Sequence, residues 1–391
     1  MLSALSLRIL PAVIALVSSA LAPGAQAQQD VRPDIVASGL QNPWAVAFLP
    51  DGRFLVTERA GRLRLLAADG ATSATVAGLP EIAAGGQGGL LDVVTDSDFA
   101  RNRILYLCYS EPAATGRANS TALASASLSA DGARLEKFKV LFSQKPKFAS
   151  SAHFGCRIVE SRAPGANGRP DGKLFLTLGD RFSRKEDAQK LDNHHGKIVR
   201  INKDGSVPAD NPFAAKAGAL PEIWSYGHRN AQGATLAPDG TFWMHEHGPQ
   251  GGDEINLPRP GVNYGWPDIT YGENYGGGQI GEGLSRRTGM EQPLHYWVPS
   301  IAPSGMAFLT SERYGKAWQG NLFVGSLKFS YLDRIELSAP FGGQVVREHK
   351  LLSDVGERIR DVRQGPDGLL YVLTDSSNGK LIRLLPREPG R

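Results

Sequence analysis

Apolar and polar residues alternate along most of this chain, in short stretches separated by glycine-containing turns. The clearest example is "WAVAFLPDGRFLVTERAGRLRLL" (Trp44–Leu66), where an apolar strand leads through an Asp-Gly turn into an alternating strand. Alternation with a period of two predicts β-strands, and an Asp-Gly pair between two of them is typical of a hairpin. No segment shows the sustained 3.6-residue apolar period of an amphipathic helix. The pattern therefore predicts an all-β protein with few, short helices.

The same hairpin returns at regular intervals. "PDGKLFLTLGD", "APDGTFWMHEH" and "GPDGLLYVLTD" repeat the centre around Asp51, with aspartates at Asp171, Asp239 and Asp367. The successive spacings are 120, 68 and 128 residues, and halving the two long ones gives 60 and 64. Thr95–Tyr109 and Gly315–Leu327 fill the two gaps and bring the number of units to six. We predict a six-bladed β-propeller with four-stranded antiparallel blades, because a pair of β-sandwich domains does not explain such even spacing.

The first 27 residues have a different character. Arg8 is the only charged residue in this segment, an apolar run follows it, and Ala25-Gln26-Ala27 matches a cleavage site of small residues. The apolar run is too short to span a bilayer. We therefore expect a cleaved signal peptide over residues 1–27, a single propeller domain over residues 28–391, and a periplasmic or secreted protein. Gly265–Gly289, rich in glycine and without alternation, is expected to be the largest loop.

Charge and cysteine content narrow the range of partners. The 43 Lys and Arg residues are interspersed with 39 Asp and Glu residues, giving a formal net charge of +4, so neither nucleic acid nor an anionic membrane is expected as a partner. The only cysteines, Cys108 and Cys156, both lie in apolar strand-like runs. A disulfide and two separately buried thiols fit this pattern equally. The oligomeric state is left open between a monomer and a homodimer.

Polar residues recur at the ends of the repeats, which a propeller gathers around one mouth of its central channel. They are Gln87 in "GGQGGLLDV", His153 in "SAHFGCRI", Asp180 in "LTLGDR", Arg229 and Asn230 in "YGHRNAQG", Lys328 in "GSLKFS", and Arg358 with Arg360 in "ERIRDV". Four cations, one histidine and one carboxylate suit a small polyanionic ligand held by arginines. Each residue alone also fits a structural role, such as a turn cap or a solvated strand face.

The stretch "MHEHGPQGGDEINL" (Met244–Leu257) has the composition of a metal site. A zinc-binding His-Glu-x-x-His motif requires a helix, but Pro249 occupies the position of the second histidine, and Gly248 with Pro249 would break that helix. Carboxylates and loop carbonyls instead offer the oxygen ligands that calcium prefers. His245 and His247 alternate on a predicted strand and need not bind a metal.

The ordered set of motifs resembles a known family. "GQGGLLDV", "HFGCRI…LFLTLGD", "GHRNAQG", "HGPQGGDEINL" with "GVNYGWP", and "RIRDV…PDGLLYVLTD" are similar to those of the soluble quinoprotein glucose dehydrogenases, and most of all the aldose sugar dehydrogenases that use pyrroloquinoline quinone (PQQ). The resemblance covers essentially the whole mature chain. It implies a six-bladed propeller that binds PQQ and calcium at the channel mouth and oxidises aldose sugars. Since the chain has no C-x-x-C-H haem motif, electrons would leave to a separate acceptor.

The resemblance also implies roles for individual residues. His153 matches the general base that takes the proton from the anomeric hydroxyl, while the C1 hydrogen passes as hydride to the quinone and the sugar becomes the lactone. Arg229 would also stabilise charge on the reduced quinone oxygen. The positions that match residues holding PQQ or the sugar are Gln87, Asp180, Arg229, Asn230, Lys328, Arg358 and Arg360.

Calcium ligands follow from the same resemblance. The backbone carbonyls of Gly248 and Pro249 match the ligands of the calcium that contacts PQQ and acts as a Lewis acid. The Asp253-Glu254 pair and Tyr264 resemble a second, structural calcium site.

The chain departs from the glucose dehydrogenase pattern at Ala152, where that pattern has an acidic residue directly before the catalytic histidine. Another group must therefore orient His153. Trp297 in "HYWVPSIAPSG" is expected to form an aromatic wall against the sugar. Two alternative functions remain: a calcium-dependent lactonase or esterase, and a non-catalytic propeller that binds sugar or protein.

Overall fold

The computed structural model describes residues 31–71, 73–161 and 171–387. The signal peptide predicted for residues 1–27 lies outside these ranges. The described chain contains 24 strands and only two short helices, α1 (Phe99–Asn102) and the 3₁₀ helix η1 (Lys185–Gln189). Neither of these helices is long and apolar enough to cross a membrane. The predicted all-β class is confirmed.

The described strands form six antiparallel sheets of four strands each. From the channel outward, the first three blades are β2 (Pro43–Phe48), β3 (Phe54–Glu58), β4 (Arg62–Leu66) and β5 (Ser73–Val76); β6 (Leu90–Thr95), β7 (Ile104–Pro112), β8 (Asn119–Leu128) and β9 (Leu135–Ser143); and β10 (Gly155–Glu160), β11 (Lys173–Leu178), β12 (Lys197–Asn202) and β13 (Ile223–Tyr226). The other three are β14 (Ala231–Leu236), β15 (Phe242–Glu246), β16 (Asp253–Asn256) and β17 (His295–Trp297); β18 (Pro303–Phe308), β19 (Leu322–Ser326), β20 (Leu332–Ala339) and β21 (Gly342–Leu351); and β22 (Ile359–Gln364), β23 (Leu370–Thr374), β24 (Gly379–Pro386) and β1 (Val31–Leu40).

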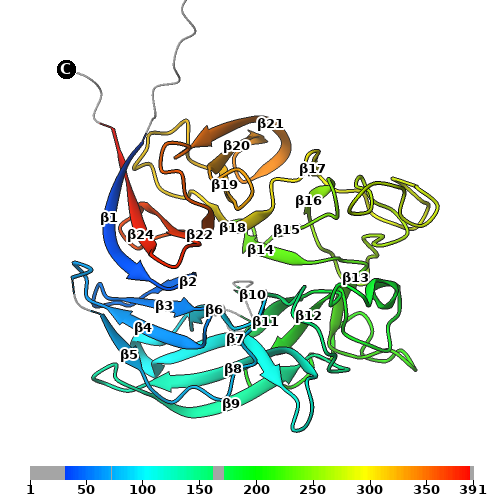
Figure 1. The fold of residues 1–391 in the computed structure, drawn as a ribbon, viewed down its shortest axis with the longest axis horizontal. Helices are drawn as coiled ribbons and strands as arrows, with labels where there is room; N and C mark the ends of the chain where they lie inside the picture. Colours follow the sequence, from blue (N-terminus) through cyan, green and yellow to red (C-terminus); the bar gives the residue numbers. More distant parts are fainter. Residues whose placement is uncertain (1–30, 72, 162–170, 388–391) are drawn as a thin grey trace, which may run out of the picture.

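The six sheets are arranged in a ring, which makes the molecule a six-bladed β-propeller (Figure 1). Each inner strand contacts the inner strand of the next blade, and β22 contacts β2 to complete the circle. The ring is closed by β1, which comes from the start of the described chain but pairs with β24 near its end. Because the two ends share one sheet, that sheet can form only when both are in place.

The periodic Asp-Gly turns fall where the repeat predicts them. Asp51, Asp171, Asp239 and Asp367 each lie between the first and second strands of a blade. The first pair in every blade also contains a register shift near the start of the inner strand. Such β-bulges bend a strand and re-aim its side chains, and they are common beside binding sites. The six inner strands therefore begin with irregular backbone around the same mouth of the channel.

Packing between neighbouring blades explains the burial pattern. Every residue of β3 and of β23 is buried, because apolar side chains from both faces pack against the adjacent sheets. The outer strand β21 is mostly exposed or half-buried. The longest connection within a blade runs through residues 257–294, between β16 and β17, and contains the glycine-rich loop expected from the sequence. It extends from the ring on the side of β13 and β17 (Figure 1).

Candidate active site

A cavity of about 150 Å³ lies on the channel axis, at the end where the inner strands begin. All six blades contribute to its wall, which identifies it as the mouth of the channel. The lining residues are Trp44, Arg59, Gln87, Leu91, Phe154, Gly155, Gln232, His247, Ala302, Leu327, Arg358 and Arg360.

His153 is paired with a buried carboxylate at the edge of this cavity. Its Nδ1 lies 2.6 Å from Oδ1 of Asp180, and Asp180 Oδ2 accepts a 2.8 Å hydrogen bond from the indole N–H of Trp266. Asp180 therefore holds the proton of His153 on Nδ1, which leaves Nε2 as a proton acceptor. Burial lowers the pKa of His153 below its usual value, while the hydrogen bond to Asp180 acts in the opposite direction. Asp180 is thus the acidic partner that Ala152 cannot supply.

The backbone around His153 is held in an unusual conformation. The φ angle of His153 is +52°, in the left-handed region that non-glycine residues seldom occupy. Gly179 makes this possible, because a Cβ at that position would lie 2.1 Å from the carbonyl oxygen of His153. The side-chain oxygen of Gln87 accepts the His153 N–H at 2.8 Å, and that of Asn230 accepts the Gly155 N–H at 3.1 Å. Two residues predicted to bind ligand therefore also hold the histidine loop.

A disulfide between Cys108 and Cys156 lies immediately beyond this loop. It joins β7 of the second blade to β10 of the third and is fully buried. The sequence left open a disulfide and two separately buried thiols, and the structure shows the disulfide. Because Cys156 is three residues after His153, the bridge also fixes the end of the histidine loop to the neighbouring blade.

Arginines make the opposite wall of the cavity positive. Arg358 and Arg360 share one carboxylate, with Nη2 atoms 3.5 and 2.7 Å from Asp375 Oδ2. Arg59, which follows β3, lines the same cavity and was not recognised from the sequence. The Nε of Arg360 is buried and has no hydrogen-bond partner in the described part of the chain. An unsatisfied buried donor beside an open cavity is a natural site for an anionic ligand.

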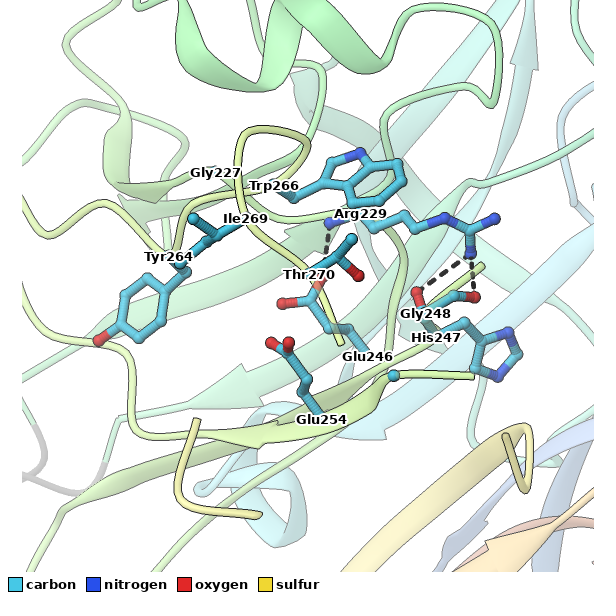
Figure 2. A pocket seen from close by; sticks show the side chains of 11 residues that line it. Gly227, Arg229, Glu246, His247, Gly248, Glu254, Tyr264, Trp266, Ile269 and Thr270 are labelled. Carbon is cyan, nitrogen blue, oxygen red and sulfur yellow. Dashed lines mark hydrogen bonds between the residues drawn. The ribbon is translucent and has the colours of Figure 1, made fainter. Parts of the chain in front are cut away.

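A second, smaller cavity adjoins the first, since His247 lines both, and Arg229 lies in the wall of the second. Figure 2 shows its guanidinium reaching the loop after β15, where Nη1 donates to the carbonyl oxygens of His247 at 3.1 Å and Gly248 at 2.6 Å. The guanidinium also lies over the ring of Trp266. The carbonyl of Arg229 accepts the N–H of Asp180 at 2.9 Å. The predicted base, its carboxylate and Arg229 are therefore in one connected group.

The smaller cavity contains two facing carboxylates. Glu246 and Glu254 are opposite each other in the β15–β16 register, and Asn256 Nδ2 donates to both at 3.2 Å. Burial and the nearby charge of Glu246 raise the pKa of Glu254. Figure 2 shows both carboxylates beside Tyr264, whose ring also stacks on His228. Glu246 was not predicted as a site residue, although hairpin register places it opposite Glu254.

Some of the predicted residues lie elsewhere. Asp253 lines neither cavity. Its carboxylate instead accepts the N–H groups of Gly248 and Ala302 at 2.8 Å each. Trp297 is buried in an apolar cluster between two blades rather than on the wall of the channel mouth. Lys328 is exposed beside Leu327, at the rim of the larger cavity.

The two histidines of the "MHEHG" stretch bond to backbone carbonyls: His245 to Gly305 at 3.5 Å and His247 to Pro303 at 2.7 Å. Within residues 31–71, 73–161 and 171–387, no three His, Cys, Asp or Glu side chains are grouped to hold a metal ion. A calcium site built from backbone carbonyls requires no such group, and the predicted ligands Gly248 and Pro249 stay a prediction. Gly248 is required by close packing, since a Cβ there would lie 2.2 Å from the Gly252 oxygen.

Comparison with known proteins identifies similar chains over nearly the whole length. The family model described as glucose/sorbosone dehydrogenase matches residues 40–383. The aldose sugar dehydrogenase YliI of Escherichia coli (strain K12) is 46% identical over 363 residues, which are 92% of this chain and 94% of that protein. The crystal structure of the soluble aldose sugar dehydrogenase from Escherichia coli superposes with a TM-score of 0.85 at 43% identity, covering 91% of this chain and 100% of the other. The PQQ-bound aldose sugar dehydrogenase from Streptomyces coelicolor superposes with a TM-score of 0.71 at 25% identity, covering 91% and 99%.

Proposed function

The chain belongs to the glucose/sorbosone dehydrogenase family, and from this premise we propose that it oxidises aldose sugars at C1 to the lactone, with PQQ as the hydride acceptor. The observation that carries the proposal is the meeting of the His153–Asp180 pair, Arg229 and an arginine-lined cavity at one mouth of the channel. The aldose dehydrogenases among its relatives support the substrate class, and the PQQ-bound relative supports the cofactor.

His153 is the proposed general base. Its Nε2 takes the proton of the anomeric hydroxyl as the C1 hydrogen leaves with its electron pair, and the C1–O bond becomes the lactone carbonyl. Burial favours the neutral form of the imidazole that this step requires. Asp180 keeps the ring in the correct tautomer and stabilises the imidazolium once the proton has arrived, as a carboxylate does for a catalytic histidine in hydrolases.

The residues of the larger cavity fit PQQ. This cofactor carries three carboxylates, and the wall offers Arg59, Arg358 and Arg360, with Asp375 as the carboxylate that pairs with the last two among the described residues. The free Nε of Arg360 supplies a buried donor for one of them. When bound, PQQ supplies the two-electron acceptance that protein side chains lack. Gln87, Asn230 and Lys328 are proposed to complete the binding of cofactor and sugar, and Arg229 to stabilise negative charge that develops beside them.

The loop after β15 fits a calcium ion. Gly248 offers a carbonyl oxygen whose second lone pair remains available beside the hydrogen bond from Arg229, and we propose that the Pro249 carbonyl is the other protein ligand. Calcium at this position supplies Lewis acidity next to the cofactor. For the second, structural ion we propose Glu254 and Tyr264 with Glu246 in place of Asp253, because the two glutamate carboxylates are buried and face each other, and burial with the nearby charge of Glu246 raises the pKa of Glu254.

The cellular setting is also part of the proposal. A buried disulfide is typical of a protein that folds in an oxidising compartment, which supports the periplasmic or secreted location expected from residues 1–27. Electrons would leave to a separate acceptor protein or small molecule.

An absorbance titration of the purified protein with PQQ, with and without calcium, followed by a panel of aldoses with an artificial electron dye, tests the proposal. We expect saturable, calcium-dependent PQQ binding and dye reduction with at least one aldose. PQQ binding without turnover of any aldose would favour a binding protein instead. Absence of PQQ binding under all conditions would refute the cofactor assignment.

A further inference from the structure

Two exposed aromatic side chains stand beside the candidate base. Phe182, just after β11, has 52% of its surface exposed, and Tyr275, in the long insertion of the fourth blade, has 63% exposed. Apolar rings with this much exposure contribute little to the core, and such residues in a group commonly mark a binding surface. Neither residue has a role in the proposed chemistry of the preceding section.

The position of Phe182 is fixed by the catalytic pair itself. Its backbone N–H donates to Oδ1 of Asp180 at 2.8 Å, the same oxygen that contacts His153. The ring stands edge-on to the imidazole of His153, with 5.2 Å between ring centroids. Phe182 has a φ of +68°, an unfavourable conformation for a bulky residue. Strained residues of this kind occur preferentially at ligand sites, where the surroundings hold them in place.

Tyr275 is fixed by Arg229 and by the loop of the predicted calcium ligands. Its hydroxyl accepts a 3.3 Å hydrogen bond from Nη2 of Arg229. The loop that carries it is joined to Gln250 by reciprocal backbone hydrogen bonds with Glu273, and by a bond from Gly276 N–H to the Gln250 side chain at 3.3 Å. The ring of Tyr275 stacks on that of Phe182 with centroids 6.4 Å apart and an angle of 22° between the planes.

The rings therefore form a series of contacts in which exposure increases away from the base: His153, then Phe182, then Tyr275. The two steps of 5.2 and 6.4 Å are each comparable to the length of one sugar unit. One face of a pyranose carries several axial C–H groups, and these pack favourably on an aromatic ring. Arg229 at the base of Tyr275 provides a hydrogen-bond donor for the hydroxyl groups at the ring edge.

We propose that Phe182 and Tyr275 form an aromatic wall that determines sugar specificity. Phe182 packs against the sugar ring whose C1 is oxidised, and Tyr275 packs against the next unit of a glycosidically linked aldose. The inference rests on the proposed function and extends it to substrate size: disaccharides and longer oligosaccharides with a free reducing end are the preferred class. Trp297, the residue first expected to form such a wall, is buried in a core cluster.

Binding of unreactive sugars tests the wall separately from catalysis. The probes are 1,5-anhydroglucitol and 1,5-anhydromaltitol, which lack the anomeric hydroxyl and cannot be oxidised, titrated by calorimetry into protein loaded with PQQ and calcium. We expect the wild type to bind the disaccharide analogue more tightly than the monosaccharide analogue. Tyr275→Ala should weaken the disaccharide analogue about tenfold and the monosaccharide analogue much less, and Phe182→Ala should weaken both. The ratio of kcat/KM for maltose to that for glucose should change in parallel.

Matched variants separate the ring from its other contacts. Tyr275→Phe keeps the ring and loses the hydrogen bond to Arg229, and Phe182→Leu keeps apolar bulk without an aromatic face. Val346→Ala removes an equally exposed apolar side chain from β21, away from the channel. We expect Tyr275→Phe and Val346→Ala to retain the preference for the disaccharide analogue. If Tyr275→Phe loses the preference, the hydrogen bond to Arg229 and not the aromatic ring causes it, and the proposed wall is wrong. If Tyr275→Ala weakens both analogues equally, the proposed wall is also wrong.

The outcomes distinguish this inference from the proposed function. If the wild type oxidises aldoses but Tyr275→Ala prefers the disaccharide analogue as strongly as the wild type does, the proposed dehydrogenase function is supported and the aromatic wall is wrong. If the wild type oxidises no aldose but binds the disaccharide analogue in a Tyr275-dependent way, the wall stands and the proposed reaction is wrong.

Discussion

Two groups of charged residues lie around the same channel but differ in how they are paired. Deeper in the channel, Arg157 and Arg363 are matched by Asp92 and Asp361 through four contacts of 2.7–3.3 Å. At the mouth, the three arginines that line the cavity face one carboxylate, Asp375, among the described residues. A single strand, β22, contributes to both groups, since Arg360 lies near its start and Asp361 and Arg363 follow.

The difference separates charges that hold the blades together from charges that are available to a ligand. In the channel, Asp92 also accepts the N–H of Ile158 and Asp361 that of Val46, so the ion pairs join the inner strands of four blades. In this group two arginines are balanced by two carboxylates, so no net charge remains for a ligand. At the mouth the positive charge is in excess and adjoins an open cavity, which is the arrangement that anion binding requires. Four predictions test this division.

Replacing His153 should have the largest effect, and only on catalysis. His153→Ala should lower kcat by about 10²- to 10⁴-fold, because the proton of the anomeric hydroxyl loses its acceptor, while PQQ affinity changes little. Dye-linked turnover and the absorbance titration measure the two quantities on the same preparation. His153→Gln, which keeps a polar side chain of similar size, is the control for packing. Unchanged turnover in either variant would show that the base is misassigned.

Removing a channel carboxylate should instead destabilise the fold. Asp361→Ala leaves Arg157 and Arg363 with one carboxylate between them, and an unpaired buried charge costs about 3–5 kcal/mol. Urea denaturation followed by tryptophan fluorescence measures the loss. The matched variant at the mouth is Asp375→Asn, which should reduce stability less, because its arginines already adjoin the open cavity. A loss below about 1 kcal/mol in Asp361→Ala would mean that the channel pairs do not hold the blades together.

The two mouth arginines should differ from each other in their effect on cofactor binding. The side chain of Arg360 is 8% exposed and that of Arg358 is 53% exposed. Arg360→Ala should therefore weaken PQQ binding by about 30-fold, and Arg358→Ala by only about threefold, because exposed charge pairs contribute less than about 1 kcal/mol. Both should affect PQQ affinity more than the turnover of the saturated enzyme. The reverse order of affinities, or a larger effect on turnover, would place these arginines on the sugar.

The blade architecture was predictable because each blade consists of local hairpins. An Asp-Gly turn and alternating apolar residues are visible within some fifteen positions, and their recurrence gave the number of blades without any knowledge of long-range contacts. The contacts between blades were less accessible. Whether Cys108 and Cys156 meet depends on how β7 and β10 pack, which no local pattern specifies.

The pairs within the candidate site depended on strand register. In the β10–β11 pair Gly155 is opposite Leu178, and continuing this antiparallel register by two residues places His153 opposite Asp180. The same relation places Glu246 opposite Glu254. Both residues of the first pair were predicted as site residues, but their contact was not, because bulges near the start of the inner strands make register impossible to count from sequence. Arg59 was missed because "TERAGR" is typical of an ordinary polar turn.

The smallest expected effect is a displacement of the pH profile, and it compares the histidine at the mouth with one packed between the fourth and fifth blades. Burial lowers the pKa of His153, so its neutral form persists below the usual value of 6.5; kcat/KM should stay level down to that pH and fall only in more acidic solution. Asp180 raises the pKa of His153 and so opposes burial. Asp180→Asn should therefore move the acid limb, the fall of kcat/KM at low pH, to still lower pH, in addition to reducing turnover. Between the fourth and fifth blades, burial lowers the pKa of His245 to about 3, and His245→Gln should leave the acid side of the profile in place. A wild-type limb above pH 6.5, or a shift to higher pH in Asp180→Asn, would mean that another group controls the profile.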